Sequence, residues 1–91
     1  MAGEVQDNAA RSRFELTVDG ETAVLDYIAS PGTLTLTHTG VPPALEGRGV
    51  GTALVAGALD AIRARGLKIV VRCWFVEAFI ARHPEFGEIR A

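Results

Sequence analysis

The chain has 91 residues, of which 48% are apolar and 22% charged, so it has room for one small globular domain. Its net charge of −2 gives no electrostatic reason to expect a nucleic acid or an anionic membrane as a partner. The single cysteine excludes an internal disulfide and a multi-cysteine zinc site, and the two histidines, without a tight spacing, suggest no metal. We expect a cytoplasmic protein, because no apolar run approaches the about 20 residues that span a bilayer.

The polar N-terminus lacks the apolar segment of a secretory signal, and residues 1–12 are expected to form a disordered leader. A single domain is then predicted over residues 13–91. Apolar and polar residues alternate from Arg13 to Val18, as in a half-buried strand. Asp19-Gly20 is a strong signal for a two-residue hairpin turn, and Thr22 to Ala29 forms the predicted return strand.

A third strand is predicted from Thr33 to Thr39, after a short turn that contains proline and glycine. In this strand Leu34, Leu36 and His38 are expected to share one face, and four threonines to line the other face. Gly40 to Pro43 ends the strand, since proline has no N–H to donate to a neighbour. The first part of the chain therefore predicts an antiparallel three-stranded meander.

An amphipathic helix is predicted from about Val50 to Arg65, because apolar residues recur there every three to four positions. Gly66 ends this helix, and Leu67 to Val71 is a short apolar strand that a right-handed crossover would place parallel to the third one. A second helix from Phe75 to His83 stops before a proline. The predicted fold class is α/β (α+β): a meander, a helix, a parallel strand and a C-terminal helix.

Three glycines, at positions 47, 49 and 51, lead directly into the first predicted helix. Glycine has no side chain to block a ligand, and the first helical turn leaves N–H groups unpaired at the positive end of the helix dipole. This combination favours an anion site for a pyrophosphate. The spacing excludes a Rossmann fingerprint, because Thr52 stands where the third glycine is needed, and a P-loop, because no Gly-Lys-Ser/Thr follows. The alternative is a tight turn in which the glycines serve geometry alone.

Four motifs occur in a fixed order along the chain. They are His38-Thr39-Gly40-Val41-Pro42, Leu45-Glu46-Gly47-Arg48-Gly49-Val50-Gly51, Cys73 followed by Phe75-Val76, and His83-Pro84-Glu85-Phe86. Together they resemble the short branch of the Gcn5-related N-acetyltransferase superfamily, over about residues 13–89. The resemblance implies a minimal acetyltransferase-like fold that binds acetyl-coenzyme A, without a metal, and transfers the acetyl group to an amine. The acceptor would be a small molecule or a peptide that the sequence does not identify.

The resemblance also implies a set of cofactor-binding residues. The pyrophosphate would be held by the backbone of Gly47, Arg48, Gly49, Val50, Gly51 and Thr52, with added charge from Arg48. The pantetheine arm would pair with the broken third strand at Thr39, Gly40 and Val41. Glu46 stands where the superfamily usually has glutamine or arginine, and a carboxylate beside phosphates is unfavourable. Glu46 therefore either points away from the phosphates or weakens cofactor binding.

The catalytic candidates are Cys73 and His38. Cys73 would act as an acid for the departing thiolate or as a nucleophile that forms an acyl-enzyme, and its alternative is a small buried apolar residue. His38 would accept the proton of the amine, since the ordinary pKa of histidine, about 6.5, suits that task. The alternative for His38 is a packed, hydrogen-bonded side chain. Many superfamily members use a tyrosine on the last helix as the acid, but this helix offers only Phe75 and Phe79.

Two other functions are open at this point. The domain could bind coenzyme A or acyl-coenzyme A without catalysis, or it could have kept the fold for protein interaction only. An aromatic set belongs to the core or lines an acceptor pocket or a dimer surface: Trp74, Phe75, Phe79 and Phe86. A monomer or a weak homodimer is expected.

Overall fold

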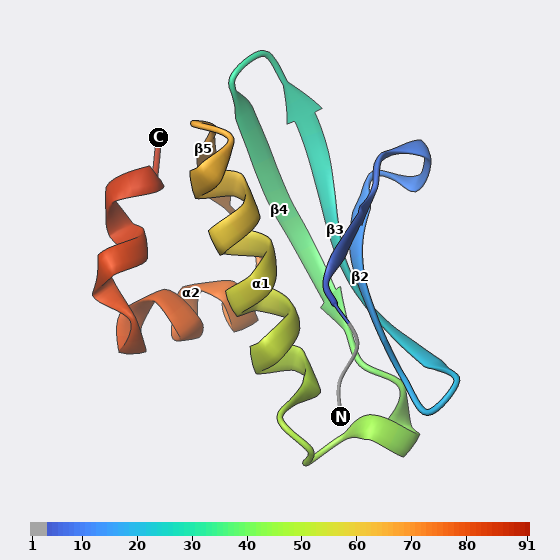
Figure 1. The fold of residues 1–91 in the computed structure, drawn as a ribbon. Helices are drawn as coiled ribbons and strands as arrows, with labels where there is room; N and C mark the ends of the chain where they lie inside the picture. The colour runs from blue at the N-terminus through green and yellow to red at the C-terminus, as the bar shows by residue number, and fades with distance from the viewer. Residues whose placement is uncertain (1–3) are drawn as a thin grey trace.

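The computed structural model describes residues 4–91, which form one five-stranded sheet with two α-helices (Figure 1). The strands are β1 (Gln6–Asn8), β2 (Arg13–Val18), β3 (Glu21–Ser30), β4 (Thr33–Gly40) and β5 (Lys68–Val71). The helices are α1 (Val50–Ala64) and α2 (Trp74–Arg82), and short 3-10 segments lie at Ala9–Arg11, Pro43–Leu45 and Pro84–Ile89. The strand order in the sheet follows the chain, and only β4 and β5 pair in parallel among these strands. The predicted meander, crossover helix, parallel strand and C-terminal helix are all confirmed.

The core lies between the sheet and the helices and forms a single apolar cluster. The buried residues of α1 are Val50, Gly51, Leu54, Val55, Ala58, Leu59 and Ile62. Apart from Gly51, they belong to the same cluster as Phe14 and Leu16 of β2 and Leu25 of β3, all 1% exposed or less. Each large apolar side chain buried in this way stabilises the fold by about 1.5–3 kcal/mol. The periodic apolar patterns of the sequence therefore mark the faces that meet in the core.

The N-terminal segment departs from the sequence prediction. Gln6–Asn8 pairs antiparallel with β2, and Ala9–Arg11 forms a 3-10 turn that Asn8 caps through its side chain. The prediction of a disordered leader is therefore wrong for residues 6–11, while residues 1–3 lie outside the described part of the chain. A polar strand of three residues has too little hydrophobic pattern to be recognised, because strand prediction depends on apolar alternation.

A β-bulge interrupts the pairing of β3 with β4. Tyr27 of β3 pairs with Leu36 of β4, whereas the preceding residue, Asp26, pairs with His38. Thr37 is the extra residue of the bulge, and its hydroxyl donates a hydrogen bond of 3.3 Å to the carbonyl oxygen of Asp26. An extra residue of this kind moves every following side chain of its strand to the opposite face of the sheet.

The bulge determines where the two residues after it point. Thr39 pairs with Leu25, which is fully buried, so its side chain lies on the core side of the sheet. The His38 side chain lies on the outer face and is exposed. The prediction that His38 shares a face with Leu34 and Leu36 is therefore wrong, because it assumed unbroken alternation.

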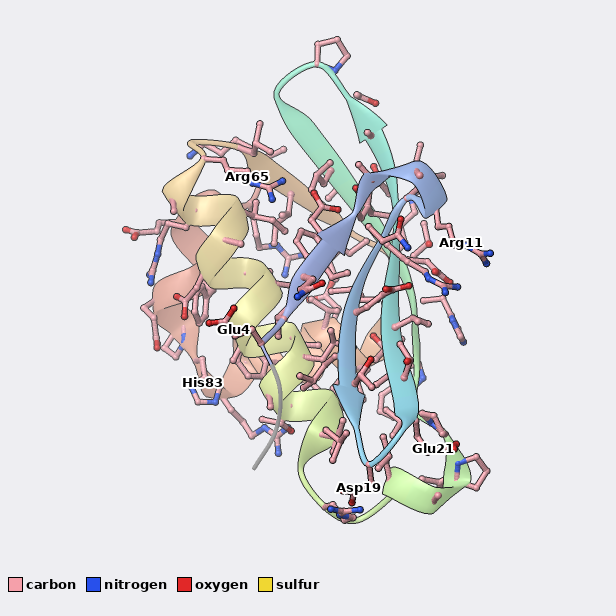
Figure 2. All side chains as sticks on the ribbon, turned by 45° about the vertical axis from the view of Figure 1, so that its right-hand side comes forward. Glu4, Arg11, Asp19, Glu21, Arg65 and His83 are labelled. Atoms are coloured by element: carbon pink, nitrogen blue, oxygen red, sulfur yellow. The ribbon has the colours of Figure 1, made fainter. Side chains whose placement is uncertain are left out.

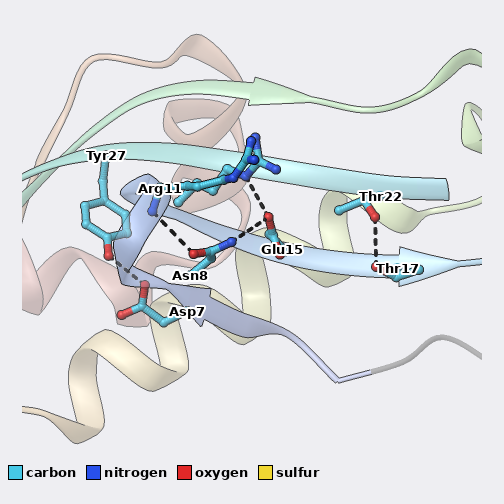
Figure 3. A network of polar contacts seen from close by, with 8 residues as sticks. Asp7, Asn8, Arg11, Glu15, Thr17, Thr22 and Tyr27 are labelled. Atoms are coloured by element: carbon cyan, nitrogen blue, oxygen red, sulfur yellow. Dashed lines mark hydrogen bonds and ion pairs between the residues drawn. The ribbon is translucent and has the colours of Figure 1, made fainter.

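Asp7 connects β1 to the rest of the molecule. The Tyr27 hydroxyl donates a 2.6 Å hydrogen bond to one Asp7 carboxylate oxygen (Figure 3), and the Arg65 guanidinium donates a 2.7 Å bond to the other. Val5, just before β1, packs directly on α1 at Gly57, where an added Cβ would lie 2.5 Å from a Val5 methyl carbon. The N-terminal segment is therefore fastened to β3 and to both the middle and the end of α1.

The ionisation of Tyr27, the one tyrosine of the chain, gives a test of this packing. Burial, and next the hydrogen bond to Asp7, raise the pKa of Tyr27 from 10.0 to about 12. Because the fold favours the neutral phenol, the stabilisation is fully present below pH 10 and is lost as the pH rises through about 12. We expect an ultraviolet titration of the folded protein to show phenolate formation near pH 12. We expect Asp7→Asn to lower that midpoint only in part, since burial is the larger cause; a wild-type midpoint near 10 would contradict the packing.

Candidate functional site

A cleft of about 550 Å³ opens where the end of β4, the turn before α1 and the start of α2 meet. Seven of the nine predicted cofactor-binding residues line it: Thr39, Val41, Gly47, Gly49, Val50, Gly51 and Thr52. The other two predicted residues, Gly40 and Arg48, do not line it. Leu45, Glu46, Trp74 and Phe75 complete the lining. Three of the four sequence motifs thus contribute to one cavity, and the fourth, His83 to Phe86, does not line it.

One wall of the cleft is a strand edge without a neighbour. β5 pairs with β4 only from Thr33 to Leu36, and the last hydrogen bond between the two segments joins Arg72 N–H to Leu36 C=O at 2.9 Å. β4 continues to Gly40, whereas the chain after β5 turns into α2. Within the described residues, the backbone of residues 37–40 therefore has no strand on this side, and its N–H and C=O groups are free to pair with an extended ligand.

The glycine turn holds a backbone conformation that other residues avoid. Gly47 and Gly49 have φ values of 76° and 73°, and nothing lies within 4 Å of a Cβ placed on either. These glycines therefore allow the backbone to change direction through positive φ values, and they leave open space beside it. Gly49 caps α1, and the first hydrogen bond of the helix runs from Ala53 N–H to Gly49 C=O at 3.0 Å. The N–H groups of residues 50–52 precede that bond and face no helical acceptor.

The charged side chains of this turn do not lie as predicted from the sequence, which placed Arg48 beside the phosphates. The Arg48 guanidinium lies 2.9 Å from the Asp19 carboxylate, in the turn between β2 and β3. Figure 2 shows Asp19 at this hairpin tip, beside the turn that leads into α1. Glu46, and not Arg48, is the charged residue that lines the cleft. Because both partners of the Arg48–Asp19 pair are largely exposed, the pair stabilises the fold by about 1 kcal/mol or less. Breaking this pair so that Arg48 can bind an anion in the cleft therefore costs little free energy.

Cys73 is buried directly behind a residue of the cleft wall. Its side chain is 6% exposed, and its sulfur lies 3.3 Å from the Thr39 hydroxyl oxygen. Thr39 lines the cleft whereas Cys73 does not, so the hydroxyl stands between the thiol and the cavity. Sequence motifs alone do not predict this pair, because the contact depends on the bulge that turns Thr39 toward the core.

His38 lies on the opposite face of β4. Its Nδ1 is 3.4 Å from an Asp26 carboxylate oxygen, its side chain is 67% exposed, and it does not line the cleft. The imidazole rests against Gly40, where an added Cβ would lie 3.2 Å from His38 Cε1. The structure therefore separates the two predicted catalytic residues, since Thr39 reaches Cys73 from one face and His38 points away from the other.

Comparison with known proteins decides the family. A family model described as GCN5-related N-acetyl-transferase matches residues 13–89. The chain belongs to the Gcn5-related N-acetyltransferase family. It is 31% identical to Protein NATD1 of Xenopus tropicalis over 88% of this chain and 76% of that protein, and 32% identical to Protein NATD1 of Danio rerio over 92% and 81%. Protein NATD1 of Homo sapiens is 31% identical over 88% of this chain and 74% of its own length.

Members of this N-acetyltransferase family generally use acetyl-coenzyme A, and most of the cleft has the chemistry to hold it. Free helix N–H groups suit the phosphates, and an unpaired strand edge suits the amides of the pantetheine arm. Glu46 is the exception, because a carboxylate repels phosphates. Among residues 4–91, no group of three histidine, cysteine or acidic side chains is placed to hold a metal, and no helix is long and apolar enough to cross a membrane.

Gly51 gives a test of the inner wall of the cleft. A Cβ on Gly51 would lie 2.8 Å from Phe75 Cζ and 3.2 Å from a Val41 methyl carbon. We expect Gly51→Ala to displace the Phe75 ring and thereby change the fluorescence of Trp74, whose ring lies 5.9 Å from that of Phe75. The melting temperature should change by only a few degrees, since the end of the ring can move and alanine favours the helix by about 1 kcal/mol. Gly87→Ala, with nothing within 4 Å, is the control, and unchanged fluorescence in Gly51→Ala would contradict the packing.

Proposed function

We propose that this protein binds acetyl-coenzyme A in the cleft and transfers the acetyl group to an amine. The observation that carries the proposal is the meeting of two sets of unpaired backbone groups, the N–H groups at the start of α1 and the open edge of β4. The first set suits a pyrophosphate and the second an extended chain that contains amides. Membership of the N-acetyltransferase family supports the same assignment.

The protein has little chemistry to supply, because acetyl-coenzyme A carries an activated thioester when it is bound. In the transfer the carbon–sulfur bond breaks, a carbon–nitrogen bond forms, the amine loses a proton and the departing thiolate gains one. Thr39 is the lining residue with a hydroxyl next to a second proton donor, since the Cys73 thiol lies 3.3 Å behind it. We assign the Thr39 hydroxyl to pass a proton to the departing thiolate while it takes one from the Cys73 thiol. The proton that the amine releases then returns Cys73 to its thiol form through solvent, so the transfer balances.

His38 can act in the proposed transfer under one condition. Its imidazole faces the outer side of β4, with Nδ1 3.4 Å from an Asp26 carboxylate oxygen. His38 can therefore take the amine's proton only from an acceptor that reaches the thioester from that side of the strand. For an acceptor that arrives through the cleft, His38 has no part in catalysis.

A non-catalytic coenzyme A-binding module is the second candidate. The observation in its favour is that the two residues predicted for catalysis lie on opposite sides of β4, one of them buried. Acetyl-coenzyme A binding is common to both functions, whereas release of free thiol in the presence of an amine is expected for the transferase only. A protein-interaction domain would show neither property.

Calorimetric titration with coenzyme A and acetyl-coenzyme A tests the binding. We expect saturable heat and a raised melting temperature in the presence of either ligand. Glu46→Gln should tighten binding about 2–5-fold, because it removes a carboxylate from beside the phosphates. Glu85→Gln, outside the cleft, controls for the change in net charge.

Absence of heat together with absence of stabilisation would contradict both cofactor-binding functions. Unchanged affinity in Glu46→Gln, with normal binding by the wild type, would show instead that this carboxylate does not face the phosphates.

The Thr39–Cys73 pair is tested by variants and by mass spectrometry. We expect Thr39→Val and Cys73→Ala each to lower thiol release at least about ten-fold, because proton transfer by a positioned group typically contributes 100-fold or more. Thr39→Ser should keep most of the rate, and Thr35→Val, on the outer side of the same strand, should keep all of it. We expect no acetyl adduct on Cys73, since the thiol is buried behind Thr39. An adduct would establish the covalent route instead, and unaltered rates in both variants would remove the pair from the reaction.

A further inference from the structure

Trp74 is a large aromatic side chain left in solvent at the edge of the cleft. It is the first residue of α2, it lines the cavity, and it is 79% exposed. Its ring packs edge to face on Phe75, with 5.9 Å between centroids, so Phe75 supports it from one side. Ile28 is the other exposed large apolar residue of the described chain, and it lies outside the cleft. An indole held at a cavity mouth with little protein cover is suited to be covered by a ligand.

In the part of the chain that the structure describes, the lining of the cleft brings no positive charge close to the indole. Glu46 is the one charged residue among the described residues that line the cavity, and no lysine or arginine does. Arg48 pairs with Asp19, and Arg72, although next to Cys73, does not contribute to the lining. An exposed indole is itself a group that attracts an organic cation, since tryptophan is the best aromatic partner for an ammonium group.

The aromatic rings elsewhere in the protein show how the Trp74 ring differs. The Arg63 guanidinium lies 4.8 Å from the centroid of the Phe86 ring, and the Arg65 guanidinium lies 5.9 Å from that of Phe14. Within residues 4–91 no arginine or lysine covers Trp74 in this way. The most exposed ring of the described chain therefore has no cation of the protein itself against it.

We infer that Trp74 binds the acceptor, and that the acceptor is an organic cation. The inference rests on the proposed acetyl transfer and names the substrate class for it. Trp74 directly follows Cys73 in the chain, so it stands beside the Thr39–Cys73 end of the cleft, where the transfer is assigned. The nitrogen that attacks the thioester must be unprotonated and is therefore uncharged. The cationic group held on the indole must then be a second nitrogen of the same acceptor. The class is therefore the diamines, with one free amine to react and one ammonium group to be held.

Binding of simple ions tests the inference without coenzyme A. Choline and its neutral analogue 3,3-dimethylbutan-1-ol have the same shape and differ in charge. Ligand-observed NMR should show that the wild type binds choline about 5-fold or more tightly than the alcohol. Trp74→Leu should abolish that preference and Trp74→Phe should reduce it, while Ile28→Ser, which removes the exposed side chain outside the cleft, should retain it. Equal binding of the two ligands by the wild type, or an unaltered preference in Trp74→Leu, would overturn the inference.

Kinetics distinguish this inference from the proposed function. We expect Trp74→Leu to raise the KM for 1,4-diaminobutane about 5-fold or more and that for butylamine less, while the Kd for acetyl-coenzyme A stays within about two-fold. A parallel loss of acetyl-coenzyme A affinity would assign Trp74 to the cofactor and overturn its acceptor role. A wild type that binds choline but no coenzyme A would contradict the proposed function and leave the cation site standing.

Discussion

The extra residue at Thr37 is the constraint on which the site depends. Because side chains alternate along a strand, this single insertion turns Thr39 toward the core and His38 toward the outer face. It also lies where β4 loses β5 as a neighbour, since the pairing ends at Leu36. One local irregularity therefore places a hydroxyl in the cleft, next to the open edge of β4, and brings that hydroxyl against the Cys73 thiol.

The turn before α1 also shapes the site through its backbone. Gly47 and Gly49 adopt left-handed φ values, which let the chain reverse and start a helix without a side chain over the first N–H groups. The positive charge that would complete an anion site is held on Asp19 by a weak, exposed ion pair. The site thus has backbone groups ready for a ligand, and a cation that needs only a side-chain movement to join them.

The sequence predicted most of the fold, because hydrophobic periodicity and turn residues are local signals. The strands from Arg13, the crossover helix from Val50 and its end near Gly66 all agree with the structure within one or two residues. Two predictions were wrong for physical reasons. β1 is polar and is fastened by Asp7 through contacts with residues 20 and 58 positions away, and the bulge at Thr37 has no local signature among alternating threonines.

The candidate site was predictable in its residues but not in its geometry. Motif order identified seven residues that line the cleft, yet the Thr39–Cys73 contact and the Arg48–Asp19 pair join segments 34 and 29 residues apart. Such contacts depend on how the strands are paired, which no single motif contains. The resemblance supplied the list of residues, and the pairing of the strands determined which of them meet.

Backbone NMR of the labelled protein would show directly whether coenzyme A binds in the cleft between β4 and α1, as we propose. Addition of coenzyme A to the labelled protein should shift the amide signals of residues 38–41 and 47–52 most strongly, and those of the outer face near Thr17 little. A second hollow of about 280 Å³ lies at the far end of α1, where Arg63 and Lys68 supply cations. Shifts centred on that hollow, or no shifts at all, would contradict coenzyme A binding in the cleft.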